Sequence, residues 1–249
     1  NTSNWPEFAW IKGTPTAAGS FEVTLGVESG NGQSATKAVT FTVVQLAATV
    51  TLSDTSLTFV SLADTTRITA TVKDQDGDTI PDATVTWATS DTTKATVSST
   101  GLVTAVASGT ATITATASGG ANKTASVTVD QVPDSITLSP TSLSFASLGD
   151  TATITPTVKD ANDSTIVSPT VTWVSSDTLK ATVSSAGLVT SKADGTTTIT
   201  ATSGSKSATV TATVAQAASS VTLSPTTLSF LVLSDTATIT ATVKDANDS

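Results

Sequence analysis

The sequence of 249 residues contains no cysteine, histidine, methionine or tyrosine. A thiol nucleophile, a Ser-His-Asp triad, a thiolate zinc site and a haem axial ligand are therefore impossible. Disulfides are excluded as well, so each folded unit depends on its hydrophobic core alone. Cysteine usage consequently says nothing about the redox compartment.

Charge and long apolar runs are also scarce. Only 12% of residues are charged, about half the usual share, and 11 basic against 20 acidic residues give a net charge of -9. The basic residues are scattered singly, so no stripe is available to release counterions from a nucleic acid. No apolar run approaches the roughly 18–20 residues of a membrane span, and no segment has the pattern of a signal peptide. We expect neither nucleic-acid binding nor membrane insertion in this segment.

The residues that are present form a repeat. TLSDTSLTFVSLADTTRITATVKD from Thr51 returns as TLSPTSLSFASLGDTATITPTVKD from Thr137 and as TLSPTTLSFLVLSDTATITATVKD from Thr222. Gln45, Gln131 and Gln216 keep the same spacings of 86 and 85 positions. A period of this length is too long for a one-motif solenoid and fits a small autonomous domain. The sequence predicts beads at 46–131 and 132–216, the beginning of a third at 217–249, and a different segment at 1–45.

Within each bead, apolar residues alternate with threonine, as in Arg67–Val72 and Thr112–Ala115. This period of two, rich in Val, Ile and Thr, is typical of half-buried strands. Turn residues recur every 8–12 positions, which predicts about seven short strands per bead. The expected fold is all-β, with tandem immunoglobulin-like Greek-key β-sandwiches arranged as beads on a string.

Two further sequence features predict details of the sandwich. Pro140 and Pro225 interrupt the first strand, and proline donates no ladder hydrogen bond, so this strand is expected to break there and pass to the other sheet. A bead of about 85 residues buries only about 60–65% of its unfolded surface. The largest side chains are therefore expected to dominate the core, and they are Trp87 with Phe59 and Trp173 with Phe145.

These repeats resemble the bacterial immunoglobulin-like domain family, group 2. The matching segments are the opening V/I-T-L-S-P, the central T-V-T-W-x-S-S-D, A-T-V-S-S-x-G-L-V-T and the closing G-T-x-T-I-T-A-T. The resemblance covers 46–216 fully and 217–249 for the first strands only. It implies a fold and a family but specifies no particular ligand, and it implies a setting in bacterial surface proteins, adhesins, secreted polysaccharide enzymes or phage virions.

The leading segment has a different pattern. Gly13–Thr24 resembles the G-T-P-T-x-x-G-x-aromatic motif of putative-Ig, cadherin-like repeats, which implies that 1–45 is the second half of such a domain. Trp5, Phe8 and Trp10 would then need partners that this chain lacks. Both ends are therefore expected to be incomplete. The sequence is either an excerpt of a longer chain, or its open ends pair with neighbouring copies by strand addition.

One turn clusters carboxylates and is the candidate metal site. Asp74, Asp76 and Asp78 flank Gly77, and hard oxygen ligands around a glycine turn suit Ca²⁺. The alternative is a hairpin tip in which Asp and Gly only supply turn geometry, and the second bead has Asp160, Asn162 and Ser164 there. The junctions are a second place for calcium, where Asp64, Asp130, Asp134 or Asp150 could contribute, although the alternative is solvated linker charge.

No catalytic or stacking site emerges from the remaining residues. Glycoside hydrolysis needs two facing carboxylic acids, but the only glutamates, Glu7, Glu22 and Glu28, all lie in the leading segment. Sequons begin at Asn1, Asn122, Asn162 and Asn247 and could accept glycans, although such triplets also arise by chance in a chain rich in Ser and Thr. We expect a protein that is not an enzyme and needs no cofactor.

The sequence favours a structural spacer of a large bacterial extracellular or cell-surface protein, adhesin-like or filament-forming. Its expected partners are further beads of the same chain, neighbouring copies, and a host-surface protein or carbohydrate. Two alternatives stay open: a phage virion appendage with weak carbohydrate attachment, and an accessory module of a secreted polysaccharide-active enzyme. A membrane anchor, a tail domain or a catalytic domain in the flanking sequence would distinguish the three.

Overall fold

A computed structural model describes residues 17–28, 30 and 32–249. Within these ranges the chain forms strands and turns without any helix, and so no helix is available there to cross a membrane. Trp5, Phe8, Trp10 and the first residues of the Gly13–Thr24 motif lie outside the described part. The absence of helices agrees with the all-β fold predicted from the alternating pattern.

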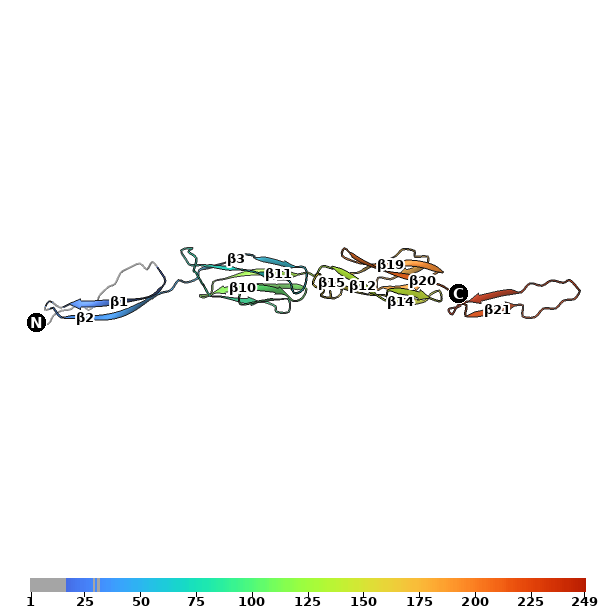
Figure 1. The fold of residues 1–249 in the computed structure, drawn as a ribbon, viewed down its shortest axis with the longest axis horizontal. Helices are drawn as coiled ribbons and strands as arrows, with labels where there is room; N and C mark the ends of the chain where they lie inside the picture. The colour runs from blue at the N-terminus through green and yellow to red at the C-terminus, as the bar shows by residue number, and fades with distance from the viewer. Residues whose placement is uncertain (1–16, 29, 31) are drawn as a thin grey trace.

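The strands form four units in one row (Figure 1). A hairpin of β1 (Gly19–Glu28) and β2 (Ser34–Val43) comes first. Two sandwiches follow, and a second hairpin of β21 (Ser220–Ser224) and β22 (Thr240–Lys244) stands last. Between β21 and β22 the chain extends away from the second sandwich and returns, so its C-terminal residues lie back at the preceding junction (Figure 1).

The first sandwich contains nine strand segments. They are β3 (Thr49–Leu52), β4 (Ser56–Phe59), β5 (Thr65–Arg67), β6 (Ala70–Lys73), β7 (Val85–Thr89), β8 (Ala95–Val97), β9 (Leu102–Ala105), β10 (Gly109–Ala117) and β11 (Asn122–Val129). One sheet has the order β4-β11-β10-β7. The facing layer contains β5-β9-β8 and the pair β3-β6. Because β4 pairs parallel with the last strand β11, the two ends of the unit are held together.

The second sandwich repeats this arrangement. Its segments are β12 (Ser135–Ser139), β13 (Ser142–Phe145), β14 (Thr151–Thr153), β15 (Thr155–Lys159), β16 (Thr172–Ser175), β17 (Ala181–Val183), β18 (Leu188–Ser191), β19 (Gly195–Ser203) and β20 (Lys206–Val214). Its sheets are β13-β20-β19-β16, β14-β18-β17 and β12-β15. The third repeat begins in the same way, because β21 pairs antiparallel with β22 in the register of β12 with β15.

The count of nine segments differs from the predicted seven because two strands are each interrupted. The first strand changes sheet, since β12 pairs with β15 while β13 pairs with β20. The break falls at Pro140, as predicted from its missing N–H. The second strand is interrupted between β5 and β6, where the Ile68 N–H donates to the Gly101 carbonyl instead of to a ladder partner.

The core of each sandwich lies between its layers. Ile68, Ile113 and Val103 are fully buried in the first sandwich, and Ile154, Ile199 and Val189 are the corresponding residues of the second. Phe59 and Phe145 are 4% and 6% exposed. Trp87 and Trp173 are only half-buried, and each packs against two buried clusters of its sandwich. The indoles therefore bridge two parts of the core at its edge.

Candidate functional site: the junctions between repeats

The loop that follows β15 is held by one aspartate. The Oδ1 atom of Asp160 accepts hydrogen bonds of 3.0 Å from the backbone N–H groups of Asn162 and Ser164. The backbone N–H of Asp160 donates to the Ser164 carbonyl, which closes the turn, and Asp163 takes a positive φ of 60° within it. Asx turns of this kind explain why Asp and Asn recur in the loop.

The second oxygen of Asp160 reaches the preceding sandwich. Its Oδ2 atom accepts a hydrogen bond of 2.9 Å from the Leu62 backbone N–H and one of 2.8 Å from the Gln131 side-chain amide. Asp160 is only 2% exposed. The carboxylate therefore connects three segments: its own loop, the linker and a turn of the first sandwich.

Asn162 completes the contact from the same loop. Its Nδ2 atom donates to the Leu62 carbonyl and to Asp64 Oδ1, each at 2.8 Å. Leu62 thus uses both of its backbone polar groups, the N–H toward Asp160 and the carbonyl toward Asn162. We call the set Leu62, Asp64, Gln131, Asp160 and Asn162 the junction clamp.

The next junction has the same clamp. Asp245 Oδ2 accepts hydrogen bonds from the Leu148 N–H at 2.9 Å and from the Gln216 amide at 3.1 Å. Asn247 Nδ2 donates to the Leu148 carbonyl at 2.8 Å and to Asp150 Oδ1 at 3.0 Å. Asp245 is 4% exposed. Because every contact recurs, the repeats meet end to end in one defined way.

The linker between the sandwiches is itself hydrogen-bonded on both sides. The Val132 N–H donates to the Val60 carbonyl of the first sandwich, and the Asp134 N–H donates to the Lys159 carbonyl of the second. The Asp134 carboxylate also forms a salt bridge of 2.9 Å with Lys206. The linker is therefore hydrogen-bonded to both sandwiches.

The clamp lowers the pKa of both aspartates. Burial of Asp160 is the largest single effect and raises its pKa. The hydrogen bonds to the carboxylate lower it by more in total, so the pKa lies below the ordinary value. For Asp245 the Leu148 N–H has the largest effect, and the pKa falls to about 2. Donors to a carboxylate favour its charged form, so both clamps hold an ionised side chain at neutral pH.

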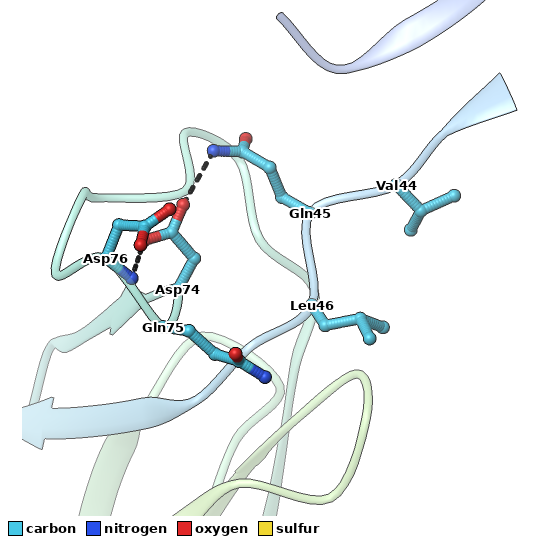
Figure 2. Close-up of a pocket in the computed structure, with 6 residues that line it drawn as sticks. All are labelled: Val44, Gln45, Leu46, Asp74, Gln75 and Asp76. Atoms are coloured by element: carbon cyan, nitrogen blue, oxygen red, sulfur yellow. Dashed lines mark hydrogen bonds between the residues drawn. The ribbon is translucent and has the colours of Figure 1, made fainter. Parts of the chain in front are cut away.

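The first repeat carries an incomplete version of the clamp (Figure 2). Asp74 Oδ1 accepts hydrogen bonds from the Asp76 and Asp78 N–H groups, at 3.1 and 3.0 Å, and Oδ2 accepts one of 3.0 Å from the Gln45 amide. Figure 2 shows the shallow hollow between this loop and the linker, which is lined by Val44, Gln45, Leu46, Asp74, Gln75 and Asp76.

This turn is the predicted calcium candidate. Asp74, Asp76 and Asp78 lie together in it, and Asp74 accepts hydrogen bonds on both of its oxygens. Across residues 17–28, 30 and 32–249, no group of three or more acidic side chains is arranged to hold a metal ion. Calcium binding at this turn stays a prediction, beside the alternative that the residues supply turn geometry.

The junction acids named from the sequence have different environments. Asp64 and Asp150 accept hydrogen bonds from asparagine amides of the following repeat, and Asp134 pairs with Lys206. The Asp130 N–H donates to the Phe59 carbonyl. Sequence reasoning missed the aspartates that reach across the junction because they lie in a loop, outside the linker. One signal could have revealed them: each linker glutamine lies 29 positions before its aspartate in all three repeats.

Two of the predicted sequons lie in the clamp. The Asn162 and Asn247 amides each donate two hydrogen bonds across a junction. A glycan on Nδ2 would replace one of the two hydrogens, so glycosylation is incompatible with the closed clamp. Asn122 donates to the Gly120 carbonyl, and Asn1 lies outside the described residues. Of the glutamates, Glu22 and Glu28 lie exposed on β1, and Glu7 is not described.

Comparison with known proteins gives one curated relative and several solved structures. The chain is 33% identical over 125 residues to ice-binding protein 1 of Shewanella frigidimarina (strain NCIMB 400), which covers 50% of this chain and 14% of that protein. Domains 4 and 5 of the S-layer protein SbsC are 26% identical, covering 68% of this chain and 98% of theirs, with a TM-score of 0.33. Extracellular cadherin domains 3–6 of protocadherin gamma B2 are 15% identical, covering 80% and 60%, with a TM-score of 0.37.

A family model matches the two complete sandwiches. The model of the bacterial Ig-like domain (group 2) matches residues 47–129 and again residues 133–214. The two matches together cover more than half of the chain and coincide with the two nine-segment sandwiches. The resemblance predicted from the repeated motifs is confirmed, and the chain belongs to the family of bacterial Ig-like domains, group 2.

Proposed function

We propose that this chain is a non-catalytic, stiff spacer segment of a large bacterial extracellular or cell-surface protein. The observation that carries the proposal is the repetition of the junction clamp, with the same partners at both described junctions between repeats. A spacer must hold its modules at a set distance and direction. A junction with a unique geometry supplies the direction, and the number of repeats supplies the distance.

The clamp restricts bending because it attaches each repeat at two separate places. The linker hydrogen bonds fix one side of the junction, and the Asp160–Leu62 and Asn162–Asp64 contacts fix another. Hydrogen bonds to a charged group contribute a net stabilisation of about 1.5–3 kcal/mol each. Since the linker keeps the two surfaces close, re-forming the contact is intramolecular and favourable.

The surface composition supports an exposed, extended role. The chain is acidic and sparsely charged, and in the two sandwiches many strand positions that face solvent are threonine, whose hydroxyl group hydrates the sheet face. At about 3.3 Å per residue, strands of about 8 residues give each bead a length of roughly 25–40 Å. A row of such beads would project a terminal module away from a surface.

The curated relative supports a setting within a longer chain. This chain spans only 14% of ice-binding protein 1, so most of that protein lies outside the match. A repeat that occupies a small part of a long protein is what a spacer requires. We propose an adhesin-like or filament-forming parent protein, with the terminal module and its receptor encoded elsewhere in that protein.

Spin-label distances across a junction test the spacer. The chain has no cysteine, so labels at Thr128→Cys and Thr211→Cys, both exposed positions, report on the first and second sandwiches alone. We expect a single narrow distance distribution for the wild type. The double variant Asp160→Ala/Gln131→Ala should broaden it, because the clamp loses its acceptor and the linker donor.

The control is Asp163→Asn, which changes a charge in the same loop but not a clamp atom and keeps a residue that tolerates positive φ. A broad distribution in the wild type would refute the stiff spacer. Antibody against the repeats added to intact producing cells tests the proposed location, and staining that appears only after lysis would argue against a cell-surface protein.

A further inference from the structure

The loop of the first repeat, Asp74–Asp78, differs at four positions from Asp160–Ser164 and Asp245–Ser249, which are identical to each other. One of the four is the position that contacts the preceding sandwich in the other two loops. The residue two positions after the clamp aspartate is asparagine in the second and third repeats, Asn162 and Asn247, but aspartate in the first, Asp76. An amide donates two hydrogen bonds, whereas an ionised carboxylate only accepts. The first repeat therefore presents the opposite hydrogen-bonding character to whatever precedes it.

Both described asparagine loops face acceptors only. Asn162 donates to the Leu62 carbonyl and to Asp64 Oδ1, and the pattern recurs at Asn247. An aspartate in this place would set one carboxylate against another and against a carbonyl, with no proton between them. Like charges at hydrogen-bond distance repel strongly when partly buried. A loop with aspartate at this position therefore does not fit the Ser-Leu-x-Asp turn, which is Ser61–Asp64 in the first sandwich and Ser147–Asp150 in the second.

The first loop also has unused acceptor capacity. Asp160 Oδ2 and Asp245 Oδ2 each accept a backbone N–H in addition to the linker glutamine, whereas among the described residues Asp74 Oδ2 accepts a hydrogen bond only from the Gln45 amide. Within the described part of the chain, no hydrogen bond or salt bridge involves the Asp76 carboxylate. Both acidic groups thus offer lone pairs on the side where the preceding domain lies.

We propose that this loop position selects the type of domain that precedes each repeat: asparagine selects a repeat that ends in the Ser-Leu-x-Asp turn, and Asp76 selects a domain whose end offers hydrogen-bond donors, either N–H groups or a lysine or arginine. The proposal rests on the spacer function, in which these contacts hold neighbours together. The change of neighbour is consistent with residues 1–45 lying outside the two family matches. In this proposal, one side chain at each junction determines which type of domain can precede the repeat.

A charge swap in the full chain tests the selection rule. Asn162→Asp places the chemistry of Asp76 opposite Asp64, and we expect loss of the narrow distance between Thr128→Cys and Thr211→Cys labels. Adding Asp64→Asn restores an amide–carboxylate pair with reversed polarity, so the double variant should regain part of the narrow distribution. The rescue is partial because the Leu62 carbonyl still loses its donor. Melting of each sandwich, followed in parallel, separates an opened junction from an unfolded repeat.

The junction between the leading hairpin and the first sandwich, at Gln45 and Asp74, allows a second test of the proposal. Labels at Thr40→Cys and Thr128→Cys report on it, and Asp76→Lys should broaden their distribution because donors then face donors. Gln75→Lys is the matched control, since it adds the same cation at the neighbouring exposed position and should change nothing.

The outcomes separate the two proposals. A broad distance distribution between the labels of the two sandwiches, in the chain with wild-type junction residues, refutes the spacer function itself. A narrow wild type with an unaffected Asn162→Asp variant, or with no rescue by Asp64→Asn, overturns the selection rule alone. An Asp76→Lys variant indistinguishable from Gln75→Lys overturns the assignment of a donor-bearing neighbour.

Discussion

Asp160 accepts a hydrogen bond of 2.9 Å from the backbone N–H of Leu62, a residue 98 positions earlier in the chain and in a different sandwich. The equivalent atoms of Asp245 and Leu148, 97 positions apart, are separated by the same 2.9 Å. A carboxylate buried at a domain junction needs several donors to stay ionised. Asp160 and Asp245 each receive two donors from their own loop and the others from the linker and the preceding sandwich, so docking adds to the stabilisation of the ionised form.

Acid should loosen the junctions. Loss of the donors from the preceding repeat moves the aspartate pKa toward the ordinary value of about 3.9, whereas the docked pKa is lowered for Asp160 and is about 2 for Asp245. The stabilisation is therefore complete above about pH 4 and is lost as the pH falls through the docked value. Between pH 7 and pH 2, we expect the distance distribution across each junction to change from narrow to broad.

The Asp160→Asn variant provides the control for this titration. The side chain of this variant cannot ionise at position 160. The distance distribution across the junction between the two sandwiches should therefore no longer change between pH 4 and pH 2. A wild-type distribution that stays narrow at pH 2 would contradict the role of the ionised carboxylates.

Gly101 is required for close packing beneath the indole of the first sandwich. Its φ is +76°, and a Cβ there would meet the Ile68 carbonyl oxygen and lie 2.9 Å from Trp87 Cζ2. Gly101→Ala should destabilise the sandwich by about 3 kcal/mol or more, combining left-handed strain of about 1–2 kcal/mol with overpacking of about 1–3 kcal/mol. Urea unfolding of the first sandwich measures the loss.

Gly77→Ala isolates the steric part of this effect. Gly77 also has a positive φ, +86°, but a Cβ there would have no neighbour within 4 Å. Gly77→Ala should lower the free energy of unfolding of the first sandwich by only about 1–2 kcal/mol. Equal losses for the two variants would show that the indole does not press on Gly101.

Trp173 and Val174 are adjacent in β16 but face opposite sides. The indole packs against two buried clusters, and Val174 is 63% exposed. We expect Trp173→Ala to cost about 3 kcal/mol, the lower end for an aromatic truncation, because the ring is only half-buried. Calorimetry should show the second sandwich melting earlier while the first is unchanged.

Val174→Ala should shift the same transition only slightly, within about 0.5 kcal/mol. If the two variants melted alike, the indole would contribute little to the core, and the sequence-based role of the tryptophans would be wrong.

The turn at Asp74 can be tested directly for calcium. If Asp74, Asp76 and Asp78 only supply turn geometry, millimolar Ca²⁺ should leave the melting temperature of the first sandwich unchanged, because hydrogen bonds from the Asp76 and Asp78 N–H groups to Asp74 already close the turn. Asp78→Ser reproduces the second repeat at this position and serves as the reference. A calcium-dependent rise in the wild type that Asp78→Ser abolishes would establish the metal site.

Much of the fold could be predicted because its causes are local. Alternation of apolar residues with threonine fixes which strand face is buried. Proline at position 140 cannot donate to a ladder and lies where the first strand changes sheet, and the first sandwich makes the same change at the equivalent Asp54, a turn-forming residue. The break in the second strand at Ile68 was not predicted. It depends on the Gly101 carbonyl, which lies across the sheet and accepts the Ile68 N–H.

The junction clamp was harder to predict than the sandwiches. Asp160 and Asn162 have the composition of an ordinary hairpin tip, and Asx turns do account for half of their hydrogen bonds. Their other atoms bond to Leu62 and Asp64 about a hundred positions away. Local pattern carries no information about such a contact, and only the constant separation of linker glutamine and loop aspartate hints at it.

The amino-acid sequence by itself determined the repeat period, the strand character and the family, because periodicity and motif spacing are properties of the chain alone. Tertiary structure decided how successive repeats meet. It brings a carboxylate from one loop to the backbone of another domain, and a hydrogen bond forms only where three-dimensional packing excludes water and aligns donor with acceptor. The equivalent five residues recur at both junctions and attach each repeat to the one before it through the same hydrogen bonds.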